Sequence, residues 1–217
     1  PLRQHNVDTG MGVERTIAML QGKKSVYETE LFGPVLDQIA GMSGHHYGES
    51  DEITRAFRVI ADHVRSSVFI MGDEQGVKPG NLGQGYVLRR LIRRCVRFGK
   101  KLGLSTGFTR GIAESIINGY RHIYPELEKN RDMVIQELVE EENRFEQTLS
   151  RGMSELEKVV GKLKEHNQPA LGGRVAFRLY DTYGFPLEFT EEICREQGLT
   201  VDRAGYDEAF KKHREVS

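Results

Sequence analysis

Apolar residues recur every three or four positions along most of this chain, the spacing that places side chains on one face of an α-helix. The clearest case spans residues 51–71, where the core face would consist of Ile53, Phe57, Ile60, Val64 and Val68. Further helices are predicted, in chain order, over residues 25–41, 111–124, 191–197 and 204–215. We therefore predict a mostly α-helical bundle with a minor β element at the amino end, where residues 6–8 are typical of a short strand.

The longest helical pattern covers residues 126–163, which form either one long helix or two nearly continuous ones. Its apolar positions step by four and three, as in a seam that packs against another helix: Phe145, Leu149, Met153, Leu156, Val160 and Leu163. Gly152 and Gly161 weaken the pattern locally. The first half of this segment is acidic, and it could either neutralise a basic surface of the chain or face solvent.

Residues 174–183 fit a strand or a helix equally well, and the run Gly184-Phe185-Pro186 ends that element. A hydroxyl side chain accepts a hydrogen bond readily at the start of a helix, so we expect Thr190 to cap a helix over residues 191–197.

The stretch 80–101 predicts a helix with two unlike faces. At about 100° per residue, its apolar residues fall on one arc: Leu88, Leu91, Ile92, Cys95 and Val96. Its basic residues fall on the other arc: Arg89, Arg90, Arg93, Arg94, Arg97, Lys100 and Lys101. Like charges on one face repel each other, so this face needs an anionic partner. A phosphate backbone is one candidate and an acidic protein surface is the other.

Composition adds that the charge is segregated. The chain has 217 residues, which is long enough for one large domain or two small ones. Its net charge is −1. No acidic residue lies between Lys78 and Arg110, and acidic residues gather over 126–146. Cys95 and Cys194 lie in helical patterns, which is typical of core residues in a reducing compartment. With no long apolar run, we expect a soluble, cytoplasmic protein.

The amino-terminal sequence NVDTGMGVER passes from a predicted strand through two glycines into a helix. By its pattern alone, this passage is either a tight turn that needs glycine or a place where a phosphate or a carboxylate binds. No lysine follows as in a P-loop, so the pattern does not identify a nucleotide site by itself.

Three stretches together resemble the class II aminoacyl-tRNA synthetases of the alanyl type. NVDTGMGVER resembles motif 3 of that class, and GYVLRRLIRR and LYDTYGFPLEFTEEI follow it in the family's order. The resemblance covers nearly the whole chain and implies ATP-dependent activation of alanine, with Mg²⁺, and transfer of the acyl group to tRNA-Ala. It further implies that Arg15 contacts the ATP phosphates and that Asp8 holds the ammonium group of alanine. Gly10 and Gly12 would line the alanine pocket.

The resemblance also implies recognition of the tRNA acceptor stem. The family reads a G·U wobble pair, whose guanine 2-amino group is unpaired in the minor groove. Asn81 and Asp181 stand at the family positions that accept hydrogen bonds from this group, while the seven basic residues of 89–101 would contact phosphates. Leu82 and Gln84 stand where the commoner sequence of the family has an acidic residue and an arginine. The phosphate contact that this arginine would make is therefore not implied for this chain. From the residues alone, Asp181 could instead cap a helix or pair with Arg178.

The chain begins at Pro1 with a motif already in place, so we expect it to be an excised piece of a longer protein. Residues 1–24 would be the carboxy-terminal edge of the catalytic domain, and residues 25–217 a helical tRNA-recognition domain. With the other synthetase motifs absent, this piece should be inactive alone and hold no cofactor. No metal is expected, because His45 and His46 have no partners at ligand spacing and the family's zinc site belongs to another region. Two other readings stay open: a non-catalytic helical nucleic-acid-binding module, and a coiled-coil adaptor built on 126–163.

Overall fold

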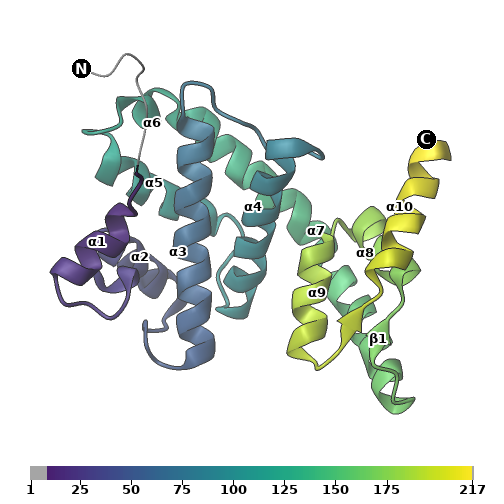
Figure 1. Cartoon of the computed structure of the whole chain (residues 1–217). Helices are drawn as coiled ribbons and strands as arrows, with labels where there is room; N and C mark the ends of the chain where they lie inside the picture. Colours follow the sequence, from purple (N-terminus) through teal and green to yellow (C-terminus); the bar gives the residue numbers. More distant parts are fainter. Residues whose placement is uncertain (1–8, 217) are drawn as a thin grey trace.

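The computed structural model describes residues 9–216, and this part of the chain is mostly α-helical, as predicted (Figure 1). The α-helices are α1 (Val13–Leu20), α2 (Gly33–Ser43), α3 (Asp51–Gly72), α4 (Gly83–Lys101), α5 (Phe108–Tyr120), α6 (Pro125–Lys129), α7 (Arg131–Glu165), α8 (Gly173–Tyr183), α9 (Leu187–Glu196) and α10 (Arg203–Val216). A short 3₁₀ helix, η1 (Val26–Glu28), precedes α2.

The two central helices, α3 and α4, pack side by side (Figure 1). On one side of them lie α1, α2, α5 and α6, and on the other side lie α8, α9 and α10 (Figure 1). The long helix α7 packs against α3, α4 and α5 with its first part and reaches α8 with its second part. Buried apolar side chains from both sides join in one core, so α7 connects the two groups of helices.

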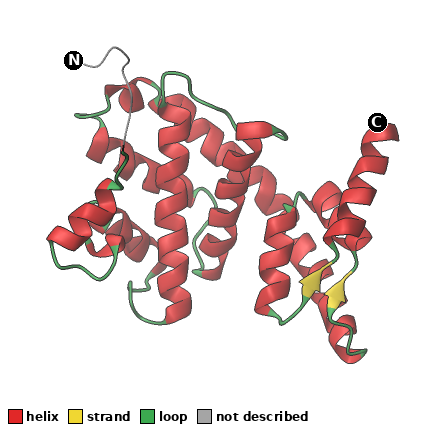
Figure 2. Ribbon diagram, viewed as in Figure 1, coloured by secondary structure: helices red, strands yellow, loops and turns green. Residues whose placement is uncertain are grey.

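The two strands found in the described residues lie in the carboxy-terminal half, which the sequence did not predict. They are β1 (Ala170–Leu171) and β2 (Thr200–Val201), and they pair in parallel, with Ala170 opposite Thr200 (Figure 2). Each strand directly precedes a helix, so the pairing fixes the start of α8 beside the start of α10. The strand predicted for residues 6–8 lies outside the described residues.

The pattern over 126–163 forms two nearly continuous helices, the second of the predicted alternatives. α6 ends at Lys129 and α7 begins at Arg131. The seam on α7 is buried within this chain, and Phe145 contacts Phe185 and Phe189 with ring centroids 5.8 and 5.9 Å apart. The apolar seam therefore packs against the molecule's own helices.

Residues 174–183 are helical, and the prediction that Thr190 caps the next helix is wrong. α9 already begins at Leu187, after the extended residue Pro186, and Thr190 is buried in its first turn. The helix starts early because Gly184 turns the chain in the left-handed region, with φ of 68°, and so ends α8 abruptly. No helix in the described part is both long and apolar enough to cross a membrane.

Candidate nucleic-acid interface

Helix α4 has the two faces that its sequence predicts. Leu88, Ile92, Cys95 and Val96 are buried, and α4 packs against α3 through this face. The burial of these side chains supplies the hydrophobic free energy that holds α4 in place. The orientation of the basic face follows from the same packing.

The basic face of α4 meets carboxylates of this same chain. Ion pairs reach α9, with Arg90–Glu188 at 2.6 Å, Arg94–Glu192 at 2.8 Å and Arg97–Glu196 at 2.6 Å. Of the two partners left open by the sequence, an acidic protein surface is therefore the one found here. The sequence itself indicates this acidic surface, because Glu188, Glu192 and Glu196 recur every fourth residue and so share one face of a helix.

Arg97 differs most from the prediction of a basic face open to a partner. Its side chain is only 4% exposed, and its guanidinium lies 5.2 Å from the centre of the Phe189 ring. In this structure α9 covers Arg97, and its guanidinium pairs with Glu196, so a phosphate contact by Arg97 stays a prediction.

The acidic half of α7 neutralises part of the same face. Glu141 is buried and lies 2.7 Å from Arg93 and 3.3 Å from Arg89, and Lys78 pairs with Glu137 at 2.6 Å. Because burying one charge alone is costly, these pairs are part of how α7 and α4 fit together. Of the two alternatives for the acidic segment, neutralisation is observed for these two glutamates.

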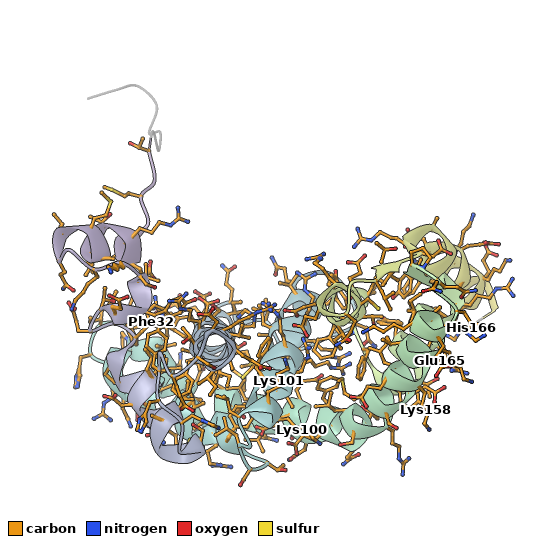
Figure 3. The ribbon with its side chains drawn as sticks, turned by 90° about the horizontal axis from the view of Figure 1, so that it is seen from below. Phe32, Lys100, Lys101, Lys158, Glu165 and His166 are labelled. Atoms are coloured by element: carbon orange, nitrogen blue, oxygen red, sulfur yellow. The ribbon has the colours of Figure 1, made fainter. Side chains whose placement is uncertain are left out.

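Four cations of α4 keep substantial exposure, and the side chain of Arg94 is 32% exposed. The side chain of Arg90 is 37% exposed, and that of Lys101 is 34% exposed. Lys100 is exposed and donates to the Ser150 hydroxyl at 2.5 Å. Figure 3 shows Lys100 and Lys101 near the middle of the molecule, away from the labelled end of α7.

Arg93 joins two of the sequence motifs. Its guanidinium donates to the carbonyl of Gly184 as well as to Glu141, and it lies over the ring of Phe145. The Gly184 turn thus rests on α4, and the motif that contains Asp181 is held against the motif that contains the basic face.

Asn81 lies in the exposed loop before α4. Its Oδ1 accepts a hydrogen bond from Arg89, and the Gly80 N–H donates to the Gly85 carbonyl at 2.9 Å. A Cβ on Gly85 would lie 2.8 Å from the Lys78 carbonyl oxygen, so only glycine allows this close turn. The amide of Asn81 is therefore presented on a defined loop, and its oxygen retains a second lone pair.

Asp181 is exposed in the last turns of α8. Its Oδ1 lies 3.7 Å from Nε2 of His213 in α10, while Arg178 pairs with Glu155 at 2.6 Å. The alternative in which Asp181 pairs with Arg178 or caps a helix is therefore not seen. The carboxylate is accessible to a ligand, with 46% of the side chain exposed.

A pocket of about 280 Å³ brings the Asn81 loop together with α8 and α10. Its wall includes Tyr180, the residue before Asp181, and Phe210, one turn before His213. The structure thus places Asn81 and Asp181 on elements that meet at α10.

At the amino end, Arg15 is exposed and lines a hollow of about 650 Å³ together with Gly12. Gly10 is also exposed, whereas Asp8 lies outside the described residues. Arg65 of α3 lines the same hollow, and its Nη1 is buried without a hydrogen-bond partner. Nothing in the sequence marks Arg65, since it lies on a helix with no motif, beside the apolar positions.

The described residues hold no group of three or more His, Cys, Asp or Glu side chains arranged to bind a metal ion. His45 instead lies 3.2 Å from Glu49, four residues along the chain.

The comparisons with known proteins agree on one family for this chain. The sequence model of the family described as "tRNA synthetases class II (A)" matches residues 1–217. The chain is 49% identical over 217 residues to "Alanine--tRNA ligase" of Treponema pallidum (strain Nichols). The match covers all of this chain and 36% of that relative. It is 51% identical over 217 residues to the protein of the same description in Treponema denticola, again covering 36% of it. A relative in Caldicellulosiruptor saccharolyticus is 42% identical over 214 residues, 24% of its length.

Proposed function

The chain belongs to the class II tRNA synthetases, and from this membership we propose that it is the RNA-recognition part of an alanine–tRNA ligase. The chain spans 36% of the length of its relatives from Treponema, so the activity of the whole protein belongs to this proposal. In the proposed reaction the carboxylate of alanine attacks the α-phosphate of ATP, which gives alanyl adenylate and releases pyrophosphate, and the acyl group then passes to tRNA-Ala with release of AMP. We assign this work to the cytoplasm.

The amino end would serve the activation step. Arg15 and Arg65 line one hollow, where Arg65 pairs with Glu14, so the exposed guanidinium of Arg15 would contact the phosphates of ATP. Asp8, Gly10 and Gly12 would hold alanine, as the family resemblance implies. ATP with its Mg²⁺ would supply the activated phosphate, while this chain's residues bind and orient it. Arg15 and Asp8 alone do not make a complete site, so this chain by itself should not activate alanine.

Residues 25–217 would read the acceptor stem, and the accessibility of Asn81 and Asp181 is the observation that carries this proposal. Both side chains offer oxygen acceptors, and both lie beside α10. An unpaired guanine 2-amino group needs such acceptors. The wide, shallow minor groove of A-form RNA admits them.

The basic residues of α4 would divide between two roles. We propose that Arg90, Arg94, Lys100 and Lys101, which keep their exposure, contact RNA phosphates. Arg89, Arg93 and Arg97 would instead hold α4 against α7 and α9, because their carboxylate partners neutralise them between the helices. The phosphate contacts would position the RNA without reading its sequence.

Binding of stem duplexes tests the proposal. The wild-type chain is titrated with an acceptor-stem hairpin that carries G·U and with the same hairpin that carries G·C. Binding that is tighter for G·U by about tenfold, within the usual range for base readout, supports the proposal. Equal affinities would show that the chain does not read the wobble pair.

A separate experiment tests the amino end. In the longer enzyme, Arg15→Ala should slow ATP-dependent alanine activation and leave tRNA affinity nearly unchanged, because Arg15 lies far from the Asn81 loop along the chain and lines a separate hollow. Pyrophosphate exchange and tRNA binding are measured on the same preparation. Unchanged exchange would contradict the role of Arg15.

A further inference from the structure

We propose that Arg65 of α3 is a positioning residue for alanine activation, because it holds helix α1 and so directs Arg15 into the hollow beside it. This inference rests on the proposed function, in which Arg15 contacts the phosphates of ATP. It assigns to a residue of the helical part of the chain a role in the work of the amino-terminal motif. Figure 1 shows α1 at the outer edge of the molecule.

Apolar packing gives α1 little to hold it in place. Ala18 is the one buried residue of this fully described helix, whereas Val13, Met19 and Leu20 have 64%, 82% and 83% of their surface exposed. The helix packs chiefly against η1. Hydrophobic stabilisation is roughly proportional to the apolar area that is buried, so it fixes the position of α1 only weakly. Polar contacts must therefore supply much of what orients α1.

The ion pair between Arg65 and Glu14 is such a contact. Nη2 of Arg65 donates to Oε1 of Glu14, which lies in the first turn of α1. Among the described residues, this is the one ion pair that joins α1 to another helix. Arg15 directly follows Glu14 and lies about 100° further around the helix. Fixing the Glu14 carboxylate therefore limits how α1 can rotate, and with it the direction of the Arg15 side chain.

Two aromatic rings hold the guanidinium of Arg65 in place. It lies 4.7 Å from the centre of the Phe32 ring and 5.6 Å from the centre of the Tyr120 ring. Phe32 is buried in the core, and Tyr120 packs against the same core. A cation over the face of a ring is attracted by that ring, and the side chain of Arg65 is only 17% exposed. Arg65 therefore offers Glu14 a guanidinium of fixed position.

The charges in the hollow favour a positioning role over a direct phosphate contact by Arg65. Arg65, Glu14 and Arg15 all line the hollow. Glu14 neutralises Arg65, whereas Arg15 is exposed and has no ion pair among the described residues. A phosphate would therefore be attracted to Arg15, and a contact with Arg65 would compete with the pair to Glu14. Arg65 thus acts on ATP through α1.

The first experiment measures whether Arg65 holds α1. Amide hydrogen exchange is followed in the 217-residue chain for wild type and Arg65→Gln, which keeps a polar side chain without the charge. The amides of α1 should exchange about tenfold faster in the variant, while those of α3 and α4 keep their protection. Because Glu14 is 36% exposed, water can solvate it after the loss of its partner, and the melting temperature should change little. Unchanged exchange in α1 would overturn the inference.

Arg58 provides the matched control. It lies on the same helix, and its guanidinium lies 5.3 Å from the centre of the Tyr27 ring and 5.6 Å from that of Tyr47. It donates to the Tyr47 hydroxyl at 2.8 Å instead of to a residue of α1. Arg58→Gln should therefore leave hydrogen exchange in α1 unchanged. If it accelerates that exchange as much as Arg65→Gln does, the pair with Glu14 is not the cause and the inference fails.

The second experiment measures the consequence for ATP in the longer enzyme. Arg65→Gln should raise the KM for ATP in pyrophosphate exchange by about tenfold, because a small displacement of a binding group weakens its contact strongly. Arg65→Lys, which keeps the positive charge, should recover part of this loss. Arg58→Gln should leave the KM for ATP unchanged. Equal KM values for wild type and Arg65→Gln would contradict the positioning role.

A double variant separates positioning from a direct contact. If Arg65 acts through Arg15, adding Arg65→Gln to Arg15→Ala should raise the KM for ATP no further. A second full rise would mean that Arg65 acts on ATP independently, which overturns the positioning role.

The same measurements keep the proposed function separate from this inference. A loss with Arg15→Ala but none with Arg65→Gln would overturn only the inference and leave the proposed function standing. Absence of alanine-dependent pyrophosphate exchange in the wild-type longer enzyme would overturn the proposed function and, with it, the role of Arg65 in activation.

Discussion

Glu192 is the carboxylate on which the arginines of two helices converge. Arg94 holds both of its oxygens, with nitrogen–oxygen distances of 2.9 and 2.8 Å, and Arg55 and Arg97 lie 2.5 and 3.6 Å away. Burial by itself would raise the pKa of Glu192, but these hydrogen bonds and positive charges outweigh it and lower the pKa. The charged carboxylate is therefore the form that the fold stabilises.

This pKa shift predicts how stability depends on pH. Because the pKa is lower in the folded state, the stabilisation is fully present above the ordinary value of 4.5 and is lost as the pH falls through the folded-state pKa. Glu192→Gln should lower the free energy of unfolding at pH 7 by on the order of 2 kcal/mol. The difference from wild type should shrink in acid.

Urea unfolding at pH 7 and in acid measures this effect. Glu191→Gln is the matched control, because it is adjacent on α9 and pairs with the exposed Arg203. Its effect should stay below about 1 kcal/mol at both pH values. A Glu192→Gln effect that is the same size at both pH values would contradict the assigned cause.

The ion pairs between helices α4 and α9 include buried pairs and exposed pairs, and the two kinds have different roles. Arg97→Ala should destabilise the fold by about 3 kcal/mol, since it removes a buried guanidinium and its 2.6 Å pair with Glu196, which keeps only longer pairs with Arg55 and Lys101. Arg90→Ala should change stability little, because that pair is more exposed. Arg90→Ala should also weaken binding to every RNA. The slope of log affinity against log salt concentration should become shallower by roughly one.

Thermal unfolding and RNA titration over a salt series check both variants. A loss of RNA affinity by Arg97→Ala with an unchanged melting temperature would mean that Arg97 contacts RNA directly. That outcome would restore the open basic face that the sequence alone predicts.

Two glycines of α7 differ in their surroundings and so predict opposite effects. A Cβ on Gly152 would lie 2.5 Å from the Phe185 ring, whereas a Cβ on Gly161 would have no neighbour within 4 Å. Gly152→Ala should therefore destabilise the protein by about 1–3 kcal/mol through overpacking. Gly161→Ala should stabilise it by up to about 1 kcal/mol, because alanine favours helix.

Chemical denaturation of the two glycine variants provides the comparison. Equal stabilisation by both would mean that α7 does not pack against the Gly184 turn as described. Equal destabilisation would mean that α7 is strained at Gly161 as well.

Helix positions were largely predictable from the sequence, because local apolar spacing determines which segments form amphipathic helices. α3 and α4 follow their patterns closely, and Pro125 and Asn130 mark the breaks around α6. The start of α9 was not predictable from Thr190, since the Gly184 turn decides it. The pairing of β1 with β2 joins two-residue segments far apart in the chain, and such short segments carry no periodicity.

The candidate site was predictable only in part. Asn81 and Asp181 came from the family resemblance, and the structure describes both as exposed. The ion-pair partners of α4 depend on how α7 and α9 pack against it, which periodicity does not encode. Arg65 could not be found, because nothing in its local sequence marks the hollow beside α1.

At the scale of the whole molecule, α7 is the connection between the amino-terminal helices and the group that holds Asp181. Asn81 precedes the central helix α4 and Asp181 lies on α8 of the second group, and these parts are joined through α4, α7 and α9. Reading one base pair with both residues requires this arrangement to be rigid. The shared core and the Arg93 contacts with Glu141 and Gly184 provide that rigidity.

A double-mutant cycle on Asn81 and Asp181 tests this account most directly. Asn81→Ala and Asp181→Ala should each cost about 1–3 kcal/mol of discrimination between G·U and G·C hairpins. Because both residues would accept from one amino group, the two losses should not add in the double variant. Additive losses that are equal for both hairpins, together with a lowered melting temperature, would contradict wobble reading and leave Asp181 a structural residue.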